Sequence, residues 1–192
     1  MEQITGLGFK TSYDLRRYFQ IKNMSTLDTI LKRYPIAFTN VRHPFERLVS
    51  GYLMFQHVKA KKCGKMDCPL VAGRTFGQFV TEYLLPAARN STNKQTYERM
   101  NAHFKPTNAF CAFCNINYTH ILKGETFSED KSRILEIVGL EDKEVRLNVK
   151  GGNGIQNLTK TYFKNLTKNR RKSVEDLYKY DLAMFEYDPN LY

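Results

Sequence analysis

The chain has no apolar run approaching 18 residues, so it contains no candidate transmembrane helix, and we recognise no signal peptide. No run of lysine and arginine exceeds three residues, which argues against a disordered nucleic-acid-binding tail. Acidic residues are few: 19 aspartates and glutamates stand against 30 lysines and arginines, a net charge of +11. This imbalance favours polyanionic partners such as nucleic acid, anionic lipid, glycosaminoglycan or nucleotide phosphates, with a solvated basic surface as the alternative.

Cysteines are also few, and they occur as two close pairs, Cys63 with Cys68 and Cys111 with Cys114. Four cysteines allow three disulfide pairings. A zinc ion held by four thiolates is the alternative, although Cys-x4-Cys is a less usual zinc-binding spacing than Cys-x2-Cys. A redox role for the second pair is disfavoured because its flanking phenylalanines indicate packing.

Potential N-glycosylation sites are more frequent than chance predicts. With 14 asparagines and 22 serines plus threonines in 192 residues, one or two Asn-x-Ser/Thr sequons are expected. Five are present, at Asn23, Asn90, Asn117, Asn157 and Asn165. Asn117 is the least certain of them, because its neighbours predict a strand. The excess and the paired cysteines both indicate an oxidising, luminal or secreted compartment, and therefore disulfides rather than zinc.

Residues 38–52, Phe-Thr-Asn-Val-Arg-His-Pro-Phe-Glu-Arg-Leu-Val-Ser-Gly-Tyr, predict a buried strand, a tight turn and a helix. Pro44 suits the first helical position, where its missing N–H costs nothing. Apolar residues then recur with helical spacing at Phe45, Leu48, Val49 and Tyr52. A helix N-terminus after such a turn favours anions.

Two side chains of this segment suit a phosphate. Arg42 lies in the turn and is a bidentate phosphate donor, and Ser50 lies eight residues later, where its hydroxyl could face the same anion. An ordinary βα unit with surface arginines is the alternative. His43 is adjacent to Arg42 and is expected to be oriented by the turn.

The segment Arg-His-Pro-Phe-Glu-Arg-Leu-Val-Ser-x-Tyr closely resembles the 3′-phosphate-binding motif of the Golgi carbohydrate sulfotransferases, the group of chondroitin 4-sulfotransferase and the HNK-1 sulfotransferase. The resemblance extends over about residues 30–190. It includes Asn-Ala-His-Phe-Lys-Pro at 101–106, Cys-Ala-Phe-Cys at 111–114, Glu-Thr with Glu-Asp at 125–130, and Leu-Tyr-Lys-Tyr-Asp with Phe-Glu-Tyr at 177–187. The chain departs from the family pattern in three places, with Phe104 for Trp, Phe113 for Pro and Thr119 for Asp.

The resemblance implies sulfuryl transfer from 3′-phosphoadenosine 5′-phosphosulfate (PAPS) to a sugar hydroxyl of a glycosaminoglycan or glycoprotein glycan such as chondroitin, with no metal. Arg42 and Ser50 fall on the family's residues for the donor 3′-phosphate. His103 is the leading candidate for the catalytic base because imidazole titrates near working pH, and a packed structural histidine is the alternative. A group of basic residues could equally be a solvated loop or a surface that binds the anionic acceptor: Lys59, Lys61, Lys62, Lys65 and Arg74.

The same resemblance implies a Golgi enzyme with an N-terminal membrane anchor and a lysine-containing 5′-phosphosulfate loop after the first core strand. Residues 1–34 contain neither feature, and Gly6–Lys10 lacks a preceding apolar strand. We therefore expect an N-terminally truncated form whose sulfate transfer is weak, and a membrane anchor in a longer form. A sulfotransferase-fold protein that binds nucleotide or glycan without turnover is the alternative function. A nucleic-acid-binding domain is disfavoured by the sequons and paired cysteines.

Residues 1–192 are expected to form one domain, since 42% hydrophobic residues can supply a core. Strands are predicted at 36–41 and 116–122 and helices from Pro44, at 75–85 and at 126–138, the second ended by Pro86 and the third by Gly139. We expect a flexible turn at 151–154 and a last helix capped by Ser173. Alternating strands and helices predict an α/β fold with a parallel sheet, in agreement with the family's P-loop-kinase-like fold.

Overall fold

A computed structural model of the 192-residue chain describes residues 29, 32, 36–57, 71–91, 97, 99–110, 117–137, 139 and 152–192. The chain divides into two compact units. One comprises residues 1–38 and 118–120, and the other comprises residues 39–117 and 121–192. The second unit contains all the helices described below, and the single-domain arrangement stays a prediction.

The sheet contains two parallel strands, β1 (Phe38–Val41) and β2 (His120–Lys123). The Ala37 carbonyl accepts from the Thr119 N–H (2.8 Å), and the Val41 carbonyl accepts from the Gly124 N–H (2.7 Å). Both partners advance along the sequence together, so the strands run in the same direction. A strand is therefore found in each predicted segment, 36–41 and 116–122, and the predicted parallel pairing is confirmed, but β2 begins only at His120.

Helix α3 (Pro44–His57) follows β1 after a two-residue turn. Its predicted apolar stripe is fully buried, with exposed fractions of 0–5% for Phe45, Leu48, Val49 and Tyr52. The helix continues this stripe with Phe55, which is also buried. The stripe is the face on which the rest of the second unit packs.

A continuous helical segment covers residues 76–90 as α5 (Phe76–Phe79), the π-helical turn η2 (Val80–Leu84) and α6 (Leu85–Asn90). The predicted start of this helix at Thr75 is confirmed by a capping box, in which Thr75 and Gln78 exchange side-chain-to-backbone hydrogen bonds. The prediction that Pro86 ends the helix is wrong. In η2 the Leu85 N–H reaches back to the Val80 carbonyl, and this wider turn admits the proline ring that a regular α-helical turn would exclude.

Two short helical elements flank β2. Helix α7 (Thr107–Phe110) precedes it, and α8 (Phe127–Ile137) follows it after a turn at Gly124. Gly139 has φ = +68°, the left-handed conformation of a helix-ending glycine, so its predicted role as the stop of this helix is confirmed.

The C-terminal region departs from the sequence expectation. Helix α9 (Gly152–Lys164) occupies the predicted turn at 151–154, and α10 (Lys168–Met184) begins before Ser173 because the Thr167 side chain caps it. Burial of Ile155, Thr159 and Phe163, spaced four residues apart, stabilises α9 despite its glycine-rich first turn. A 3₁₀ turn, η3 (Pro189–Leu191), follows.

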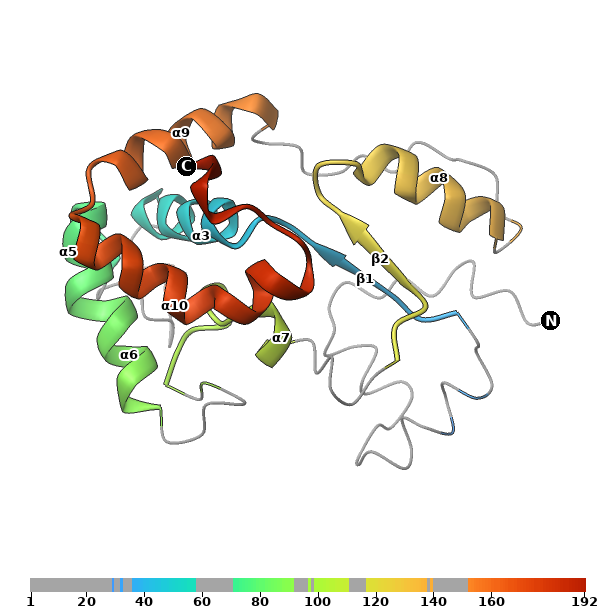
Figure 1. Cartoon of the computed structure of the whole chain (residues 1–192), viewed down its shortest axis with the longest axis horizontal. Helices are drawn as coiled ribbons and strands as arrows, with labels where there is room; N and C mark the ends of the chain where they lie inside the picture. Colours follow the sequence, from blue (N-terminus) through green and yellow to red (C-terminus); the bar gives the residue numbers. More distant parts are fainter. Residues whose placement is uncertain are drawn as a thin grey trace. The chain divides into compact units, whose positions relative to one another are not determined.

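Figure 1 shows α9 and α10 on either side of α3, and the 76–90 segment across their ends. The rings of Phe45 and Phe163 stack with centroids 4.4 Å apart and join α3 to α9. This arrangement of helices beside a small parallel sheet confirms the α/β class. No described helix has the length and apolar character needed to cross a bilayer.

Candidate functional site

The candidate site begins where β1 ends, at the turn formed by Arg42 and His43. The Arg47 N–H donates to the His43 carbonyl (3.0 Å), which is the first hydrogen bond of α3. His43 therefore occupies the N-cap position, with Pro44 after it. The sequence prediction of a strand, a turn and a helix N-terminus at this point is confirmed.

His43 is a structural residue of the turn. Its buried ring accepts the Phe45 N–H at Nδ1 (3.2 Å), and its Nε2 lies 3.1 Å from the Asp188 carbonyl oxygen. These partners require the neutral tautomer with the proton on Nε2. Burial lowers the pKa of His43, which keeps this form at neutral pH. The expectation that the turn orients His43 is met by these contacts.

The turn between β2 and α8 is joined to the same site through Glu125. One carboxylate oxygen of Glu125 accepts the His43 N–H (3.1 Å), and the other accepts the Tyr187 hydroxyl (3.0 Å). A Cβ at the preceding Gly124 would lie 3.4 Å from the Val41 carbonyl oxygen and 3.5 Å from Arg42 Nε. The glycine therefore gives the Arg42 side chain room to lie over the end of the sheet.

Arg42 extends toward the first turn of α3, where its Nε lies 3.9 Å from Glu46 Oε2. Its side chain is 40% exposed and so remains accessible to a ligand, whereas that of Glu46 is buried. The Tyr192 hydroxyl donates to Glu46 Oε1. Burial raises the pKa of Glu46, and the Tyr192 hydrogen bond opposes that rise. Glu46 thus holds Arg42 in place without removing it from solvent.

Ser50 lies one turn beyond Glu46 in α3 and is half-buried. Residues four apart share a helix face, so Glu46 and Ser50 lie on the face toward which Arg42 reaches. Ser50 is six residues beyond Pro44, or about 9 Å along the axis at 1.5 Å per residue. Ser50 therefore shares a face of α3 with Glu46, the residue beside which Arg42 lies.

The exposed His103 lies on a segment that packs against the middle of α3. A Cβ at Gly51 would lie 2.9 Å from the Phe104 ring and 3.6 Å from His103 Cβ, so the glycine permits this close packing next to Ser50. The His103 ring is 5.6 Å from that of Phe55. Desolvation and then the positive charge of Arg47 lower the pKa of His103, so the ring is neutral at pH 7.

A buried polar network holds the segment that carries His103. Arg47 donates to the Lys105 carbonyl, and its Nη2 lies 3.7 Å from Asp181 Oδ2. Asp181 also accepts the backbone N–H groups of Thr107 (2.5 Å) and Asn108 (2.8 Å) at the start of α7. Burial raises the pKa of Asp181, and these donors oppose that rise.

Sequence reasoning singled out the motifs that contain Glu46, Arg47, Tyr178 and Asp181 but gave these residues no role. One signal in the sequence could have indicated a role for them: these polar residues occupy helix positions next to apolar residues that become buried. Their partners lie tens of residues away in sequence, so spacing alone could not pair them. The basic loop 59–65 lies outside the described residues, and Arg74 forms an ion pair with Glu82 (3.0 Å).

The four cysteines, and with them the choice between disulfides and zinc, lie outside the described residues. In the ranges that the structure does describe, no group of three or more His, Cys, Asp or Glu side chains could hold a metal ion. The described part of the site supplies an arginine, a serine, a neutral histidine and buried carboxylates, a set suited to binding a phosphate and accepting a proton.

Comparison with known proteins places this site in a family. A model of the sulfotransferase family matches residues 8–188. The chain is 27% identical to mouse (Mus musculus) carbohydrate sulfotransferase 11 over 179 residues, which cover 83% of this chain and 49% of the mouse protein. It is 29% identical to human (Homo sapiens) carbohydrate sulfotransferase 9 over 169 residues, which cover 77% of this chain and 36% of the human protein. No solved structure matches.

The chain belongs to the sulfotransferase family, and its curated relatives are carbohydrate sulfotransferases. The family resemblance drawn from the sequence motifs is thereby confirmed. The chain spans about half the length of the mouse relative and about a third of the human one.

Proposed function

We propose that this chain is a carbohydrate sulfotransferase, which transfers a sulfuryl group from PAPS to a sugar hydroxyl of a glycan. The observation that carries the proposal is the contact of Arg42 with Glu46 at the carboxyl end of a parallel strand, with Ser50 one turn further along α3. Ligands of open α/β sheets bind at this end of the strands. The family match and the names of the relatives support the choice of reaction.

In this proposal Arg42 and Ser50 hold the 3′-phosphate of PAPS. Arg42 is exposed enough to meet a phosphate, and Glu46 keeps its guanidinium near this face of α3. The backbone N–H of His43 already donates to the Glu125 carboxylate and is therefore not available to a phosphate. The side chains of Arg42 and Ser50 supply the phosphate contacts instead. These contacts position the donor without touching the sulfur.

His103 is the proposed base. Its neutral ring takes the proton of the acceptor hydroxyl while that oxygen bonds to the sulfur and the bond from sulfur to the phosphate oxygen breaks. The products are the sulfated sugar and adenosine 3′,5′-bisphosphate. The packing of His103 against Gly51, the residue that follows Ser50 in α3, supports this role.

We further propose that the protein acts in the Golgi lumen on an anionic acceptor such as chondroitin. Four of the five sequon asparagines lie in the described residues, and all four are exposed: Asn90, Asn117, Asn157 and Asn165. Asn117 precedes β2 and is exposed despite the strand predicted there. Exposed sequons are compatible with a glycosylated luminal protein.

The test is transfer of labelled sulfate from PAPS to desulfated chondroitin. We expect Arg42→Ala to lower kcat/KM about 10–100-fold, the effect of removing one charge-assisted hydrogen bond. Arg133→Ala, which removes an exposed arginine from α8, is the matched control and should leave the rate unchanged. Binding of adenosine 3′,5′-bisphosphate without any transfer would favour a protein that binds nucleotide or glycan without turnover.

A further inference from the structure

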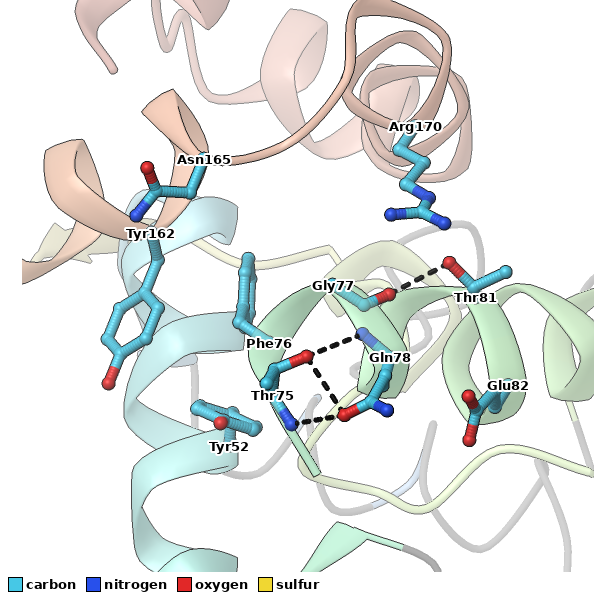
Figure 2. A pocket seen from close by; sticks show the side chains of 10 residues that line it. All are labelled: Tyr52, Thr75, Phe76, Gly77, Gln78, Thr81, Glu82, Tyr162, Asn165 and Arg170. Atoms are coloured by element: carbon cyan, nitrogen blue, oxygen red, sulfur yellow. Dashed lines mark hydrogen bonds between the residues drawn. The ribbon is translucent and has the colours of Figure 1, made fainter. Parts of the chain in front are cut away.

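A second feature of the fold is a pocket of about 510 Å³ between α3, the start of the 76–90 segment and the junction of α9 with α10 (Figure 2). We call it the α9–α10 pocket. Its lining includes Tyr52, Phe76, Gln78, Tyr162, Asn165 and Arg170. None of the proposed donor and base residues lines it, so the site described above does not account for this pocket.

One wall of the pocket is built from three aromatic rings. The centroid of the Phe76 ring lies 5.2 Å from the centroid of the Tyr52 ring and 5.2 Å from that of the Tyr162 ring, and the centroids of the two tyrosine rings are 5.5 Å apart. Tyr52 and Phe76 are buried, whereas Tyr162 is half-buried and keeps surface for a ligand. Tyr162, packed against the other two rings, can therefore cover the C–H face of a sugar ring and remove it from water.

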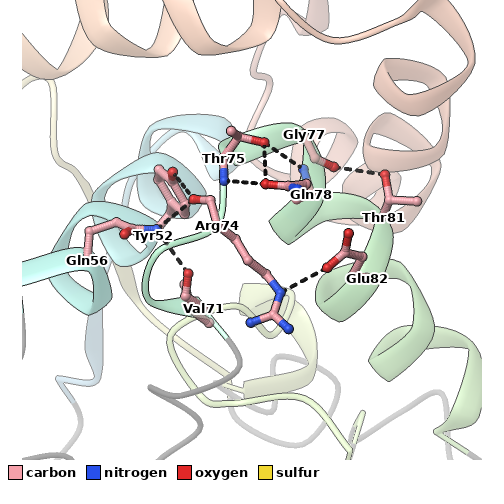
Figure 3. Close-up of polar contacts among 9 residues, drawn as sticks. All are labelled: Tyr52, Gln56, Val71, Arg74, Thr75, Gly77, Gln78, Thr81 and Glu82. Atoms are coloured by element: carbon pink, nitrogen blue, oxygen red, sulfur yellow. Dashed lines mark hydrogen bonds and ion pairs between the residues drawn. The ribbon is translucent and has the colours of Figure 1, made fainter. Parts of the chain in front are cut away.

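Arg74, which precedes the lining residue Thr75, contacts two other lining residues, Tyr52 and Glu82 (Figure 3). The Arg74 carbonyl accepts from the Tyr52 hydroxyl (2.7 Å) and from the Gln56 amide (2.9 Å). The Arg74 guanidinium, in turn, pairs with Glu82 (3.0 Å). The acidic residue in the lining is thus neutralised, and Tyr52 is held in one orientation.

The remaining charge of the pocket is positive. Arg170 is exposed, and one of its guanidinium nitrogens lies 3.4 Å from the point where a Cβ at Gly77 would stand. Among the described side chains, none forms an ion pair with Arg170. In Figure 2 its side chain points down toward Gly77 and Thr81. A ligand with an acid group can therefore pair with it without displacing a protein carboxylate.

The helices that meet at the pocket carry further positive charge. Lys160 and Lys164 on α9 and Lys168 at the start of α10 are exposed. No acidic residue occurs between positions 152 and 174. This local excess of positive charge favours an anionic ligand over a neutral one.

We propose that the α9–α10 pocket binds an anionic sugar unit of the acceptor polysaccharide, with Arg170 pairing with its acid group and Tyr162 covering its ring. The positive charge of Lys160, Lys164 and Lys168 would favour an anionic chain over a neutral one. This inference rests on the proposed function, in which the acceptor is a glycan, and it assigns acceptor binding to a surface separate from the donor site.

Asn165 affects the design of the test because it lines the pocket and is also a sequon asparagine. A glycan attached there would stand at the pocket mouth. Thr167, the third sequon residue, caps α10 through the Arg170 N–H and should be left intact. Asn165→Gln keeps an amide and removes the glycosylation signal, so it is the reference protein for every measurement.

The experiment measures binding of a desulfated chondroitin hexasaccharide and of a chondroitin sulfate hexasaccharide by calorimetry. We expect Arg170→Gln to weaken binding at least about tenfold, as expected for loss of a charge-assisted hydrogen bond. Tyr162→Ser should also weaken it. Lys172→Gln, on the same helix and already paired with Glu175, should change it less than twofold. An uncharged N-acetylglucosamine hexasaccharide should bind more than tenfold more weakly than either anionic one.

A second measurement separates the two proposals. Adenosine 3′,5′-bisphosphate should bind the reference protein and Arg170→Gln equally, and the thermal unfolding midpoints of the variants should agree. Failure of the reference protein to bind either chondroitin hexasaccharide, or equal binding by Arg170→Gln, would overturn the acceptor pocket while leaving the donor site standing. If the reference protein bound the oligosaccharides but not adenosine 3′,5′-bisphosphate, the donor site alone would be contradicted. A preference for the sulfated over the desulfated oligosaccharide would identify sulfate as the acid group that Arg170 meets.

Discussion

The Tyr178 hydroxyl on α10 donates a 2.7 Å hydrogen bond to the Phe104 carbonyl, which lies 74 residues earlier in the chain. Both residues are buried, and burial raises the pKa of Tyr178 well above its ordinary value. The phenol is therefore always protonated and always available as a donor. This bond fixes the backbone next to His103, so α10 positions the proposed base without contacting a substrate.

Tyr178→Phe removes only the hydroxyl and leaves the buried Phe104 carbonyl without this partner. We expect the free energy of unfolding to fall by about 1–2 kcal/mol. Tyr180→Phe is the matched control, because Tyr180 is 58% exposed two residues further along α10. Urea titration of both variants checks the prediction, and equal midpoints would show that the buried bond contributes no net stability.

Asp181→Asn should destabilise the fold through α7. The asparagine keeps one acceptor oxygen, but its amide nitrogen would face a backbone N–H of Thr107 or Asn108, and the pairing with Arg47 is lost. We expect a loss of about 1–3 kcal/mol in the free energy of unfolding. Asp176→Asn on the exposed side of α10 should cost much less. An Asp181→Asn protein as stable as the parent would mean that the ionised carboxylate gives no net stabilisation once the cost of its desolvation is included.

His103 should set the acidic limb of the pH–rate profile. Its pKa is lowered from 6.5 by burial and by Arg47, so the neutral base form is present at pH 7 and is lost as the pH falls through that lowered pKa. His103→Gln should reduce kcat about 10²–10⁴-fold and remove this limb. His120→Gln, on β2, is the control. A changed melting temperature with an unchanged pH profile would assign His103 a packing role only.

The four cysteines are predicted to form disulfides in protein purified from a secretory host, because the sequon excess indicates an oxidising compartment. Non-reducing mass spectrometry should find no free thiol at Cys63, Cys68, Cys111 or Cys114. Stoichiometric zinc together with four reactive thiols after unfolding would support the alternative site.

The sequence predicted the elements whose signals are local. The stripe that begins at Phe45 repeats with helical spacing, and Thr75 with Gln78 forms a capping box whose two partners are three residues apart. Pro86 misled because a single π-helical turn can accommodate a proline, and no local pattern marks such a turn. Helix α9 was missed altogether because its glycines suggested a turn, whereas burial of Phe163 against Phe45 stabilises the helix.

The same distinction applies to the site. Arg42 and Ser50 could be identified because both belong to one strand–turn–helix segment. Tyr192, which donates to Glu46, and Asp181 and Tyr178, which contact Arg47 and Phe104, come from the chain end and from α10, so only the folded arrangement reveals these contacts. The α9–α10 pocket likewise draws its lining from segments more than 20 residues apart, which spacing in the sequence cannot bring together.

The most direct test of the donor site compares adenosine 3′,5′-bisphosphate with adenosine 5′-monophosphate, which lacks only the 3′-phosphate. Calorimetry should show that the protein prefers the bisphosphate, and that Arg42→Ala and Ser50→Ala each reduce this preference while leaving affinity for the monophosphate unchanged. For Arg42→Ala the loss should be about 1.5–3 kcal/mol, the range for a charge-assisted hydrogen bond. An undiminished preference for the bisphosphate in Arg42→Ala would contradict the assignment of the 3′-phosphate to Arg42.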